Sequence, residues 1–312
     1  MKILVTGALG TLGRPLVAEL RRRGYTVHGC DLRHDSDERN IRCDVSDYRQ
    51  MARVLEGEYD VVYHLAAEFG RWNGEHFYEQ AWRSNVIGTR NILELQRAHG
   101  FRLVFTSSSE VYGDAGGDVL DEGVMEREAV TQQNDYAISK WVNEVQCRNF
   151  MDRYGSDIVR VRLFNAYGPG EHYHAYRSVV CLFAYRALHG IPFDVYRDYH
   201  RVFMYIDDLI PTFANVHERG VTGEVYNIGG VEYRSVEELA ALVLRETGAP
   251  ESLIQWQSTD AHNRKNKRPD VSKAAAALGH NPTVTLEEGI PRTVAWLRGV
   301  YGISNPGVDL AA

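Results

Sequence analysis

Short apolar runs alternate with stretches of helical periodicity through the first half of the chain. The apolar runs predict strands near residues 2–6, 26–31, 60–65, 102–107 and 158–164. Between them, apolar side chains recur with the spacing of amphipathic helices, which predicts helices over 11–23, 47–56, 75–99 and 134–153. This alternation is typical of a parallel sheet with helices on both faces. The expected fold class is therefore α/β, with a doubly wound parallel sheet.

The alternation breaks near residue 165. A turn cluster over 165–170 is followed by a segment rich in aromatic residues and arginine, 171–204. Later elements are predicted as strands over 202–206 and 224–228 and as helices over 235–247 and 286–299. The changed pattern predicts a smaller, mixed α/β unit at the C-terminal end.

A glycine-rich turn joins the first predicted strand to the first predicted helix. Gly7, Gly10 and Gly13 recur at every third position, with Thr11 and Leu12 between the last two. Glycine allows a tight turn and a close approach of the backbone to a pyrophosphate, and the following helix N-terminus offers that anion unpaired N–H groups. The spacing G-x-x-G-x-x-G is a variant of the common G-x-G-x-x-G pattern. It predicts a dinucleotide site.

Acidic residues follow the next two predicted strands. Asp31 ends the second strand, close to the spacing of about 20 residues expected for a ribose-binding acid. A carboxylate there accepts hydrogen bonds from the ribose hydroxyls and repels a 2′-phosphate, so NAD is favoured, while Arg33 keeps NADP open. Asp44 follows a short strand over 40–43, and we expect it at the adenine edge. With strand, helix and acid present, a glycine turn that binds nothing is the weaker alternative.

Composition limits the classes of partner. The chain has 312 residues, 44% of them hydrophobic, and a formal net charge of −7, which offers no basic surface to nucleic acid or to an anionic membrane. No apolar run approaches the roughly 20 residues that span a bilayer. With a strand expected from residue 2, we expect no N-terminal signal peptide and a cytoplasmic protein.

Cysteine and histidine usage gives no sign of a metal centre. The four cysteines are scattered without a C-x-x-C motif, which is typical of thiols in a reducing compartment. His172 and His174 form the only close histidine pair in the sequence, and no cluster of acids or cysteines accompanies them at ligand spacing. We therefore expect no metal.

Tyr136 and Lys140 lie one helical turn apart in the predicted helix over 134–153, so they share a face. A tyrosine titrates near pH ~10 and is a poor base at neutral pH. A neighbouring ammonium and a positive nicotinamide would lower the pKa of Tyr136. The phenolate would then take a proton from a substrate hydroxyl while a hydride leaves the adjacent carbon. The alternative is an ordinary helix, because Y-x-x-x-K alone is a weak signal.

Hydroxyl groups and a carboxylate follow the predicted strand over 102–107. Ser108, Ser109 and Glu110 lie at the carboxyl end of this central strand, where ligands bind in open sheets. Ser108 is suited to hydrogen-bond the reacting oxygen, and Glu110 to act as a second acid or base. If the segment stays extended, Ser108 and Glu110 share a side. The alternative is a polar exit from the strand without chemistry.

Taken in order, these motifs resemble those of the extended short-chain dehydrogenase/reductases, in the nucleotide-sugar epimerase/dehydratase group. The resemblance covers nearly the whole chain and rests on Thr6-Gly7-x-x-Gly10-x-x-Gly13, Asp44-Val45, Tyr63-His64-Leu65-Ala66-Ala67, Asn85-Val86-x-Gly88-Thr89, the segments 107–113 and 162–170, Tyr136-x-x-x-Lys140, and Arg268-Pro269-Asp270. It implies a Rossmann-type NAD-binding domain over 1–165 plus segments near 201–230. It also implies a nucleotide-sugar-binding domain over 166–200 and 231–312, and a homodimer.

The same resemblance assigns roles to residues. Contacts with NAD are expected from Gly7, Gly10, Thr11, Leu12, Gly13, Asp31, Leu32, Arg33, Asp44, Val45, Leu65, Ala66, Ala67, Asn85, Tyr136 and Lys140. The catalytic residues are expected to be Ser108, Ser109, Glu110, Tyr136 and Lys140. Substrate contacts are expected from Glu68, Ser108, Asn165, Arg177, Arg201 and Arg268. Glu68 and Arg177 belong to segments that depart from the family pattern, and the basic stretch over 264–268 is either a solvated loop or a phosphate contact.

The favoured reaction is 4,6-dehydration of a nucleotide-linked hexose, and Glu110 motivates it. Transfer of a hydride from sugar carbon 4 to NAD gives a 4-ketone, and a carboxylate can then remove the carbon-5 hydrogen. The Ser-Glu pair also resembles uronate decarboxylases. A 4-epimerase, an NAD(P)-dependent carbonyl reductase and a non-enzymatic dinucleotide sensor stay open as well. The sensor is the weakest of these, because it needs no base.

Overall fold

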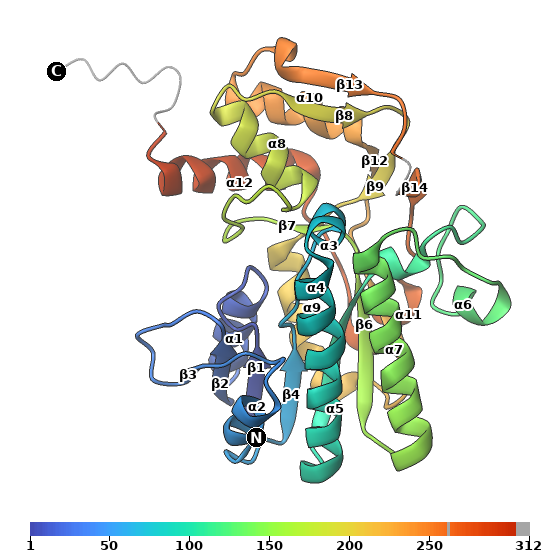
Figure 1. The fold of residues 1–312 in the computed structure, drawn as a ribbon. Coiled ribbons are helices and arrows are strands. Elements are labelled where there is room, and N and C mark those ends of the chain that lie inside the picture. The colour runs from blue at the N-terminus through green and yellow to red at the C-terminus, as the bar shows by residue number, and fades with distance from the viewer. Residues whose placement is uncertain (261–262, 304–312) are drawn as a thin grey trace.

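The structure is a computed structural model that describes residues 1–260 and 263–303. Within these residues, seven parallel strands form one sheet in the order β11-β6-β5-β4-β1-β2-β3 (Figure 1). Their bounds are β1 Lys2–Thr6, β2 Thr26–Asp31, β3 Asn40–Arg42, β4 Val61–His64, β5 Arg102–Ser108, β6 Ile158–Leu163 and β11 Val225–Ile228. The predicted doubly wound parallel sheet is confirmed. The strand order reverses between β1 and β4, and open sheets bind ligands at such a point.

Helices cover both faces of the sheet. One face packs against α1 (Gly13–Arg22), α9 (Ile206–Arg219) and α11 (Ser272–Leu278), and the other against α2 (Tyr48–Leu55), α5 (Gly88–His99) and α7 (Asp135–Tyr154). Successive side chains of β1 divide between the two cores, with Ile3 and Val5 in the first and Leu4 in the second. Burial on both faces explains why these strands are continuous apolar runs.

A smaller core lies beyond the carboxyl ends of the strands, at the top of Figure 1. It is formed by α8 (Val179–Leu188), α10 (Val236–Thr247) and α12 (Leu286–Tyr301), with the parallel strand pair β8 (Phe193–Tyr196) and β13 (Ile254–Gln257). α10 starts at a capping box, in which the Ser235 hydroxyl accepts from the Glu238 N–H and the Glu238 carboxylate accepts from the Ser235 N–H. This part is the mixed α/β unit that the sequence predicts.

Short strands join the two parts. β9 (His200–Val202) lies between β12 (Tyr233–Ser235) and β14 (Asn266–Lys267), and β7 (Ala166–Tyr167) pairs with β10 (Met204–Tyr205). The predicted strand over 202–206 is partly wrong, because α9 already begins at Ile206. The apolar run is buried throughout, and periodicity cannot separate a buried strand from a buried helix segment.

The single helix predicted over 75–99 is interrupted. The chain forms α3 (Arg71–His76), α4 (Tyr78–Ala81) and a π-helical segment, η1 (Trp82–Ile87), before α5 begins. Phe77, with φ −134° and ψ 50°, leaves the helical region and ends α3. The start at Arg71 brings the N-terminal end of α3 to the carboxyl side of the sheet.

The remaining short elements are η2 (Ser109–Tyr112), α6 (Val124–Arg127) and η3 (Glu251–Leu253). α11 falls in the range expected for the sugar-binding domain, yet Ala274 and Leu278 pack in the core formed by α1, α9 and the sheet. The domain boundaries otherwise stay a prediction. Among the helices of the described ranges, none has the length and apolar character to cross a bilayer.

Candidate active site

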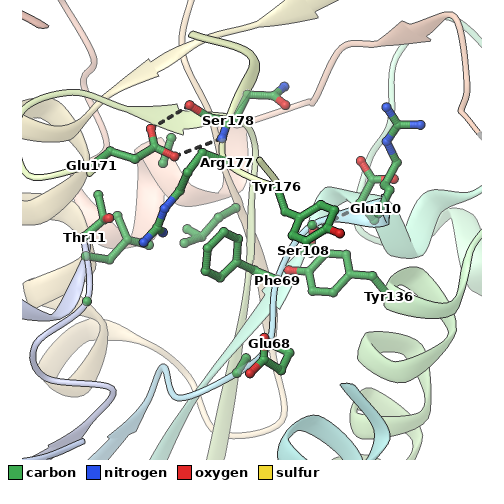
Figure 2. Close-up of a pocket in the computed structure, with 18 of the residues that line it drawn as sticks. Thr11, Glu68, Phe69, Ser108, Glu110, Tyr136, Glu171, Tyr176, Arg177 and Ser178 are labelled. Atoms are coloured by element: carbon green, nitrogen blue, oxygen red, sulfur yellow. Dashed lines mark hydrogen bonds between the residues drawn. The ribbon is translucent and has the colours of Figure 1, made fainter. Parts of the chain in front are cut away.

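A cavity of about 850 Å³ lies between the sheet and the smaller core (Figure 2). Its walls come from the glycine-rich turn, from the chain that follows β2, β4, β5 and β6, and from α8 and the strands beside it. The sequence-predicted residues that line it are Gly7, Gly10, Thr11, Leu12, Gly13, Asp31, Leu32, Arg33, Asp44, Val45, Leu65, Ala66, Ala67, Glu68, Ser108, Ser109, Glu110, Tyr136, Lys140, Asn165, Arg177 and Arg201. The structure therefore gathers the cofactor and substrate sets in one place.

The glycine-rich turn has room for hydrogen only at two of its positions. Gly7 has φ 69°, and a Cβ there would lie 2.8 Å from the Ala66 nitrogen. A Cβ at Gly13 would lie 2.1 Å from the Gly7 carbonyl oxygen. α1 begins at Gly13 without a side-chain cap at Leu12, and in its first turn the Arg14 N–H bonds to the Gly10 carbonyl oxygen at 3.1 Å.

The Asp31 carboxylate holds the backbone of the glycine-rich turn and of the chain that follows β2. Its Oδ2 accepts from the Leu9 N–H at 3.0 Å, and its Oδ1 accepts from the Arg33 N–H at 3.0 Å. The Arg33 guanidinium also pairs with Asp31 at 3.3 Å, although more than half of the Arg33 side chain is exposed. Asp44 accepts from both the N–H and the hydroxyl of Ser46. A cradle that excludes Cβ atoms, with a carboxylate at the end of β2, fits a dinucleotide.

Tyr136 and Ser108 face one another across the cavity floor (Figure 2). Asn134 starts α7 by accepting from the Ala137 N–H at 2.8 Å, which places Tyr136 in the first turn. Burial raises the pKa of Tyr136 to about 12, against the opposing effect of its hydrogen bond with Ser108. The pair is thus positioned for one substrate oxygen, with the tyrosine still protonated.

Lys140 does not lower the pKa of Tyr136 within the protein, contrary to the expectation from the sequence. Its Nζ donates to the Thr106 carbonyl oxygen at 2.9 Å and lies 5.4 Å from the centroid of the Phe105 ring. Burial lowers the pKa of Lys140 itself to about 8. The physical reason for the difference is that the Lys140 ammonium is hydrogen-bonded to the backbone of β5, where burial disfavours its charged form.

The sequence predicts Ser108 and Glu110 on one side on the assumption that the segment after β5 is extended. The structure shows a helical turn there instead. Ser108 is the N-cap of the 3₁₀ helix η2, and its Oγ accepts from the Glu110 N–H at 3.2 Å. The hydroxyl of a capping serine turns back on its own chain, which brings Glu110 into the next turn. Ser108, Ser109 and Glu110 nevertheless all line the cavity.

Glu110 is surrounded by positive charge. Its Oε1 accepts from Lys267 Nζ, whose side chain is 2% exposed, and its Oε2 accepts from Asn134 Nδ2 at 3.4 Å. The charges of Lys267, Arg71 and Arg201 outweigh burial and lower the pKa of Glu110 to about 2. Burial, with the repulsion of both arginines, lowers the pKa of Lys267 to about 8. Glu110 is therefore held as a carboxylate.

The two arginines near Glu110 differ in their partners. Arg201 is buried, and its guanidinium donates to the carbonyl oxygens of His200, Lys265 and Arg264 at 2.6–2.7 Å. Arg71 pairs at 2.6 Å with Asp260, whose side chain is 2% exposed. Both arginines line the cavity.

Two sequence-predicted residues lie outside the cavity wall. The buried Asn85 accepts from the Glu68 N–H at 2.8 Å and donates to the Ser139 hydroxyl at 2.9 Å, so it fixes neighbouring backbone rather than facing the cavity. Arg268 is exposed, and its guanidinium lies 5.8 Å from the centroid of the Tyr233 ring. Asn165 does line the cavity, in a left-handed conformation with φ 40°.

Several wall residues carried no sequence signal of their own. Phe69, Arg71, Glu171 and Tyr176 line the cavity without belonging to a known motif. They fall within residues 68–73 and 171–177, the two segments that contain Glu68 and Arg177 and depart from the family pattern, and this departure was the available hint. Lys267 belongs to the basic stretch over 264–268, yet nothing local indicated its ion pair with Glu110.

The comparison with family profiles matches residues 3–229 to the NAD dependent epimerase/dehydratase family. The chain belongs to this family. Its cofactor is NAD, and the glycine-rich turn and Asp31 are the residues whose geometry fits that group. Members of the family differ in net reaction, as the family's own description states.

Curated relatives and solved structures cover nearly all of the chain. A UDP-N-acetyl-alpha-D-glucosaminuronate decarboxylase from Bacillus cytotoxicus is 28% identical, over 96% of this chain and 98% of the relative. UDP-glucuronic acid decarboxylase 1 from Danio rerio is 30% identical, over 95% of this chain and 72% of the relative. A double mutant of DesIV, a dTDP-glucose 4,6-dehydratase from Streptomyces venezuelae solved with NAD, is 28% identical with a TM-score of 0.87, over 97% and 98% of the two chains. The chain is therefore similar to enzymes that catalyse different net reactions, decarboxylation and 4,6-dehydration.

Proposed function

We propose that this protein decarboxylates a nucleotide-linked uronic acid through a 4-keto form of the sugar. The observation that carries the proposal is the ion pair of Glu110 with the buried Lys267, beside Arg201 and Arg71. Two relatives that match nearly the whole chain are named as decarboxylases of such sugars, which supports the same substrate class.

The charges around Glu110 favour a substrate that brings its own carboxylate. Lys267 pairs with Glu110 and Arg71 with Asp260, whereas Arg201 forms no ion pair with a carboxylate anywhere in the described ranges. Burying a cation without an anion is costly. A carboxylate on carbon 6 of the sugar would offset that cost.

The same charges make Glu110 a weak base. A carboxyl group with a pKa of about 2 takes up a proton poorly at neutral pH. A 4,6-dehydration needs a base for the carbon-5 hydrogen. Loss of carbon dioxide from a 4-keto acid does not, because the bond between carbons 5 and 6 breaks and its electron pair moves toward the ketone oxygen.

Tyr136 and Ser108 are placed to handle that oxygen throughout the reaction. NAD, held by the glycine-rich turn and Asp31, would supply reversible hydride transfer at carbon 4. Tyr136 takes the proton of the 4-hydroxyl group and then, with Ser108, donates hydrogen bonds to the oxygen as negative charge develops there. Carbon 5 takes a proton from water after carbon dioxide has left.

Product analysis tests the proposal. The purified protein would be incubated with NAD in D₂O and, in separate reactions, with UDP-glucuronic acid, UDP-N-acetylglucosaminuronic acid, UDP-glucose and dTDP-glucose. We expect carbon dioxide and a nucleotide sugar one carbon shorter, with deuterium at carbon 5, from a uronate. Loss of water from a hexose, or inversion at carbon 4 without carbon dioxide, would contradict the proposal.

Arg201→Met tests the carboxylate contact directly. We expect the affinity for UDP-glucuronic acid to fall by roughly 10-fold or more, and that for UDP-glucose to change much less, because only the uronate brings a second anion. Calorimetry with both ligands measures this, and Arg197→Met, at an exposed arginine outside the cavity, is the control. Equal losses for the two sugars would place Arg201 at the diphosphate, as the family resemblance implies.

The second candidate is 4,6-dehydration. It is favoured by the position of Glu110, whose backbone N–H bonds to the Ser108 hydroxyl, so that its carboxylate lies one short turn from the groups that hold oxygen 4. The products of dTDP-glucose and UDP-glucose decide between the two. A 4-keto-6-deoxy sugar, formed by the protein but not by Glu110→Gln, would establish the dehydratase.

A further inference from the structure

Cys30 and Cys43 bring two free thiols together on neighbouring strands. Cys30 lies in β2 and pairs in register with Ile41 of β3, and Cys43 comes two residues after Ile41. The Cys43 N–H continues the pairing by donating to the Asp31 carbonyl oxygen at 2.8 Å. Both side chains therefore point to the same face of the sheet, where they pack in the core under α2, α5 and α7. The two thiols hydrogen-bond one another there.

Both cysteines also line the cavity, and each comes one residue before an acid that we assign to the cofactor. Cys30 precedes Asp31, whose carboxylate holds the glycine-rich turn, and Cys43 precedes Asp44, which we expect at the adenine edge. Cys30 is 0% and Cys43 is 2% exposed, so bulk solvent does not surround either thiol. A small oxidant would reach them through the cavity, at times when no dinucleotide fills it.

The hydrogen bond between the thiols gives them different reactivities. It lowers the pKa of Cys43, against the effects of burial and of the charges of Asp44 and Asp47. It raises the pKa of Cys30, as burial also does. Because the thiolate is the form that reacts with oxidants, Cys43 is the thiol expected to react first and Cys30 the one expected to follow.

We propose that Cys30 and Cys43 form a site of reversible oxidation by peroxides, at which a disulfide between them weakens the binding of the dinucleotide. The Cys43 thiolate attacks hydrogen peroxide, takes one oxygen as a sulfenic acid and releases hydroxide, which combines with the proton that Cys43 has lost. The Cys30 thiol then attacks the Cys43 sulfur, the S–S bond forms, and the sulfenic oxygen leaves as water with the Cys30 proton. Two thiols thus lose two electrons, and the peroxide is reduced to two water molecules.

The disulfide acts on the cofactor site through the edge of the sheet. Two bonded sulfur atoms lie closer together than two that share a hydrogen bond, so the ends of β2 and β3 must approach one another. β3 has three residues and is the edge strand (Figure 1), so it is the strand that moves, and Asp44 moves with it. The inference is independent of the net reaction on the sugar, because it concerns only the NAD that the family uses.

Peroxide treatment of the full chain, stripped of cofactor, tests the proposal. Peptide mass spectrometry without a reductant should find the Cys30 and Cys43 peptides joined, and the affinity for NAD⁺ should fall by roughly 10-fold or more. Dithiothreitol should restore the affinity. Saturation with NAD⁺ before the peroxide should suppress the cross-link, because the coupling between binding and oxidation is reciprocal. Thiols that stay reduced, or a cross-link that leaves NAD⁺ affinity unchanged, would overturn the proposal.

Two variants separate this site from other targets of peroxide. The double variant Cys30→Ser/Cys43→Ser cannot form the disulfide, so its affinity for NAD⁺ should be the same with and without peroxide. Cys181→Ser is the matched control, because Cys181 does not line the cavity and its Sγ donates to the Glu171 carbonyl oxygen at 3.3 Å, a contact that serine can keep. It should oxidise like the parent chain.

A peroxide-induced loss of NAD⁺ affinity in the double variant as large as that of the parent chain would assign the effect to another residue and overturn the proposal. Melting without ligand verifies that the variants fold. The cross-link and the affinity of the parent chain are measured without any variant, so they remain decisive if the double variant misfolds.

Discussion

Tyr136 is protonated across the neutral range because burial raises its pKa to about 12. The hydrogen bond with the Ser108 hydroxyl acts to lower the pKa of Tyr136, whereas Lys140 donates to the Thr106 carbonyl oxygen. The phenolate therefore needs a positive charge that arrives with the cofactor. We therefore expect Tyr136 to act as a base only when NAD is bound.

Tyr136→Phe isolates that role. Removing the hydroxyl deletes the proposed proton acceptor and keeps the ring, so we expect turnover to fall by about 10²- to 10⁴-fold while the affinity for NAD is unchanged. Steady-state kinetics and cofactor titration measure the two effects. Tyr25→Phe, which removes the hydroxyl that bonds to Glu218 on the surface, is the control. A Tyr136→Phe variant with near-normal turnover would remove the tyrosine from the mechanism.

At the scale of elements, the junction of β1 and α1 admits no side chain at Gly13. The backbone oxygen of Gly7 occupies the place where a Cβ would lie, and a backbone atom cannot rotate away. Gly299, by contrast, has nothing within 4 Å of its Cβ position in α12. Gly299→Ala is therefore a suitable control for Gly13→Ala.

We expect Gly13→Ala to abolish NAD binding and to lower the melting temperature, because the turn must open to relieve the clash. Gly299→Ala should be neutral or stabilise by roughly 0.5–1 kcal/mol, since alanine is the better helix former. Thermal melts with and without NAD compare them. Normal NAD affinity in Gly13→Ala would show that the turn is not the cofactor site.

His64 ties β4 to β1 and α5 as a neutral ring. Its two nitrogens bond to the hydroxyls of Thr6, at 2.8 Å, and Thr89, at 3.2 Å. Burial, helped by the charge of Lys140, lowers its pKa from 6.5 to about 3. The unfolded chain takes up this proton below pH 6.5 and the folded chain does not. The stability that the neutral ring contributes is thus present above pH 6.5 and is lost as the pH falls toward 3.

At pH 5 we expect this one histidine to cost about 2 kcal/mol of unfolding free energy relative to pH 7.5. His64→Gln keeps a polar side chain but does not titrate, so its stability should fall less over the same interval. Urea unfolding at the two pH values measures the difference. Parallel losses in both proteins would mean that His64 titrates normally.

At the scale of the whole molecule, ion pairs and hydrogen bonds join the sheet domain to the smaller part. Arg71, at the start of α3, pairs with Asp260 across 189 residues of sequence. His76 bonds to the Tyr176 hydroxyl at 2.8 Å, and Gly70 packs on the Tyr176 backbone. The segment over 68–76 therefore connects the sheet domain to the smaller part through side-chain contacts.

Arg71→Met should weaken this connection. It removes the Arg71 partner of the buried Asp260 carboxylate, and we expect a loss of roughly 1–3 kcal/mol in the free energy of unfolding. Arg22→Met removes an exposed pair with Glu19 and should leave the free energy of unfolding nearly unchanged, because solvent screens such a pair. Denaturant unfolding compares the variants, and hydrogen exchange should rise around residues 171–178 in Arg71→Met alone. Equal stability of both variants would show that the pair does not hold the two parts together.

The sequence by itself determined what depends on local pattern. The apolar runs at 2–6 and 158–164 are strands because both faces of the sheet are buried, and the glycines at 7 and 13 identified the turn because only glycine fits there. Tyr136 and Lys140 share a helix face by periodicity alone. These features need only neighbouring residues, so a single sequence contains them.

Only the tertiary structure decided the electrostatics of the site. Lys267 meets Glu110 across 157 residues of sequence, and no local pattern predicts that ion pair. The 3₁₀ turn at Ser109 and the anchoring of Lys140 to Thr106 likewise depend on neighbouring chain in space. A pKa reflects burial and every nearby charge, and the fold brings those charges together from distant parts of the chain. The sequence therefore named the chemical groups, while the tertiary structure set their charge states.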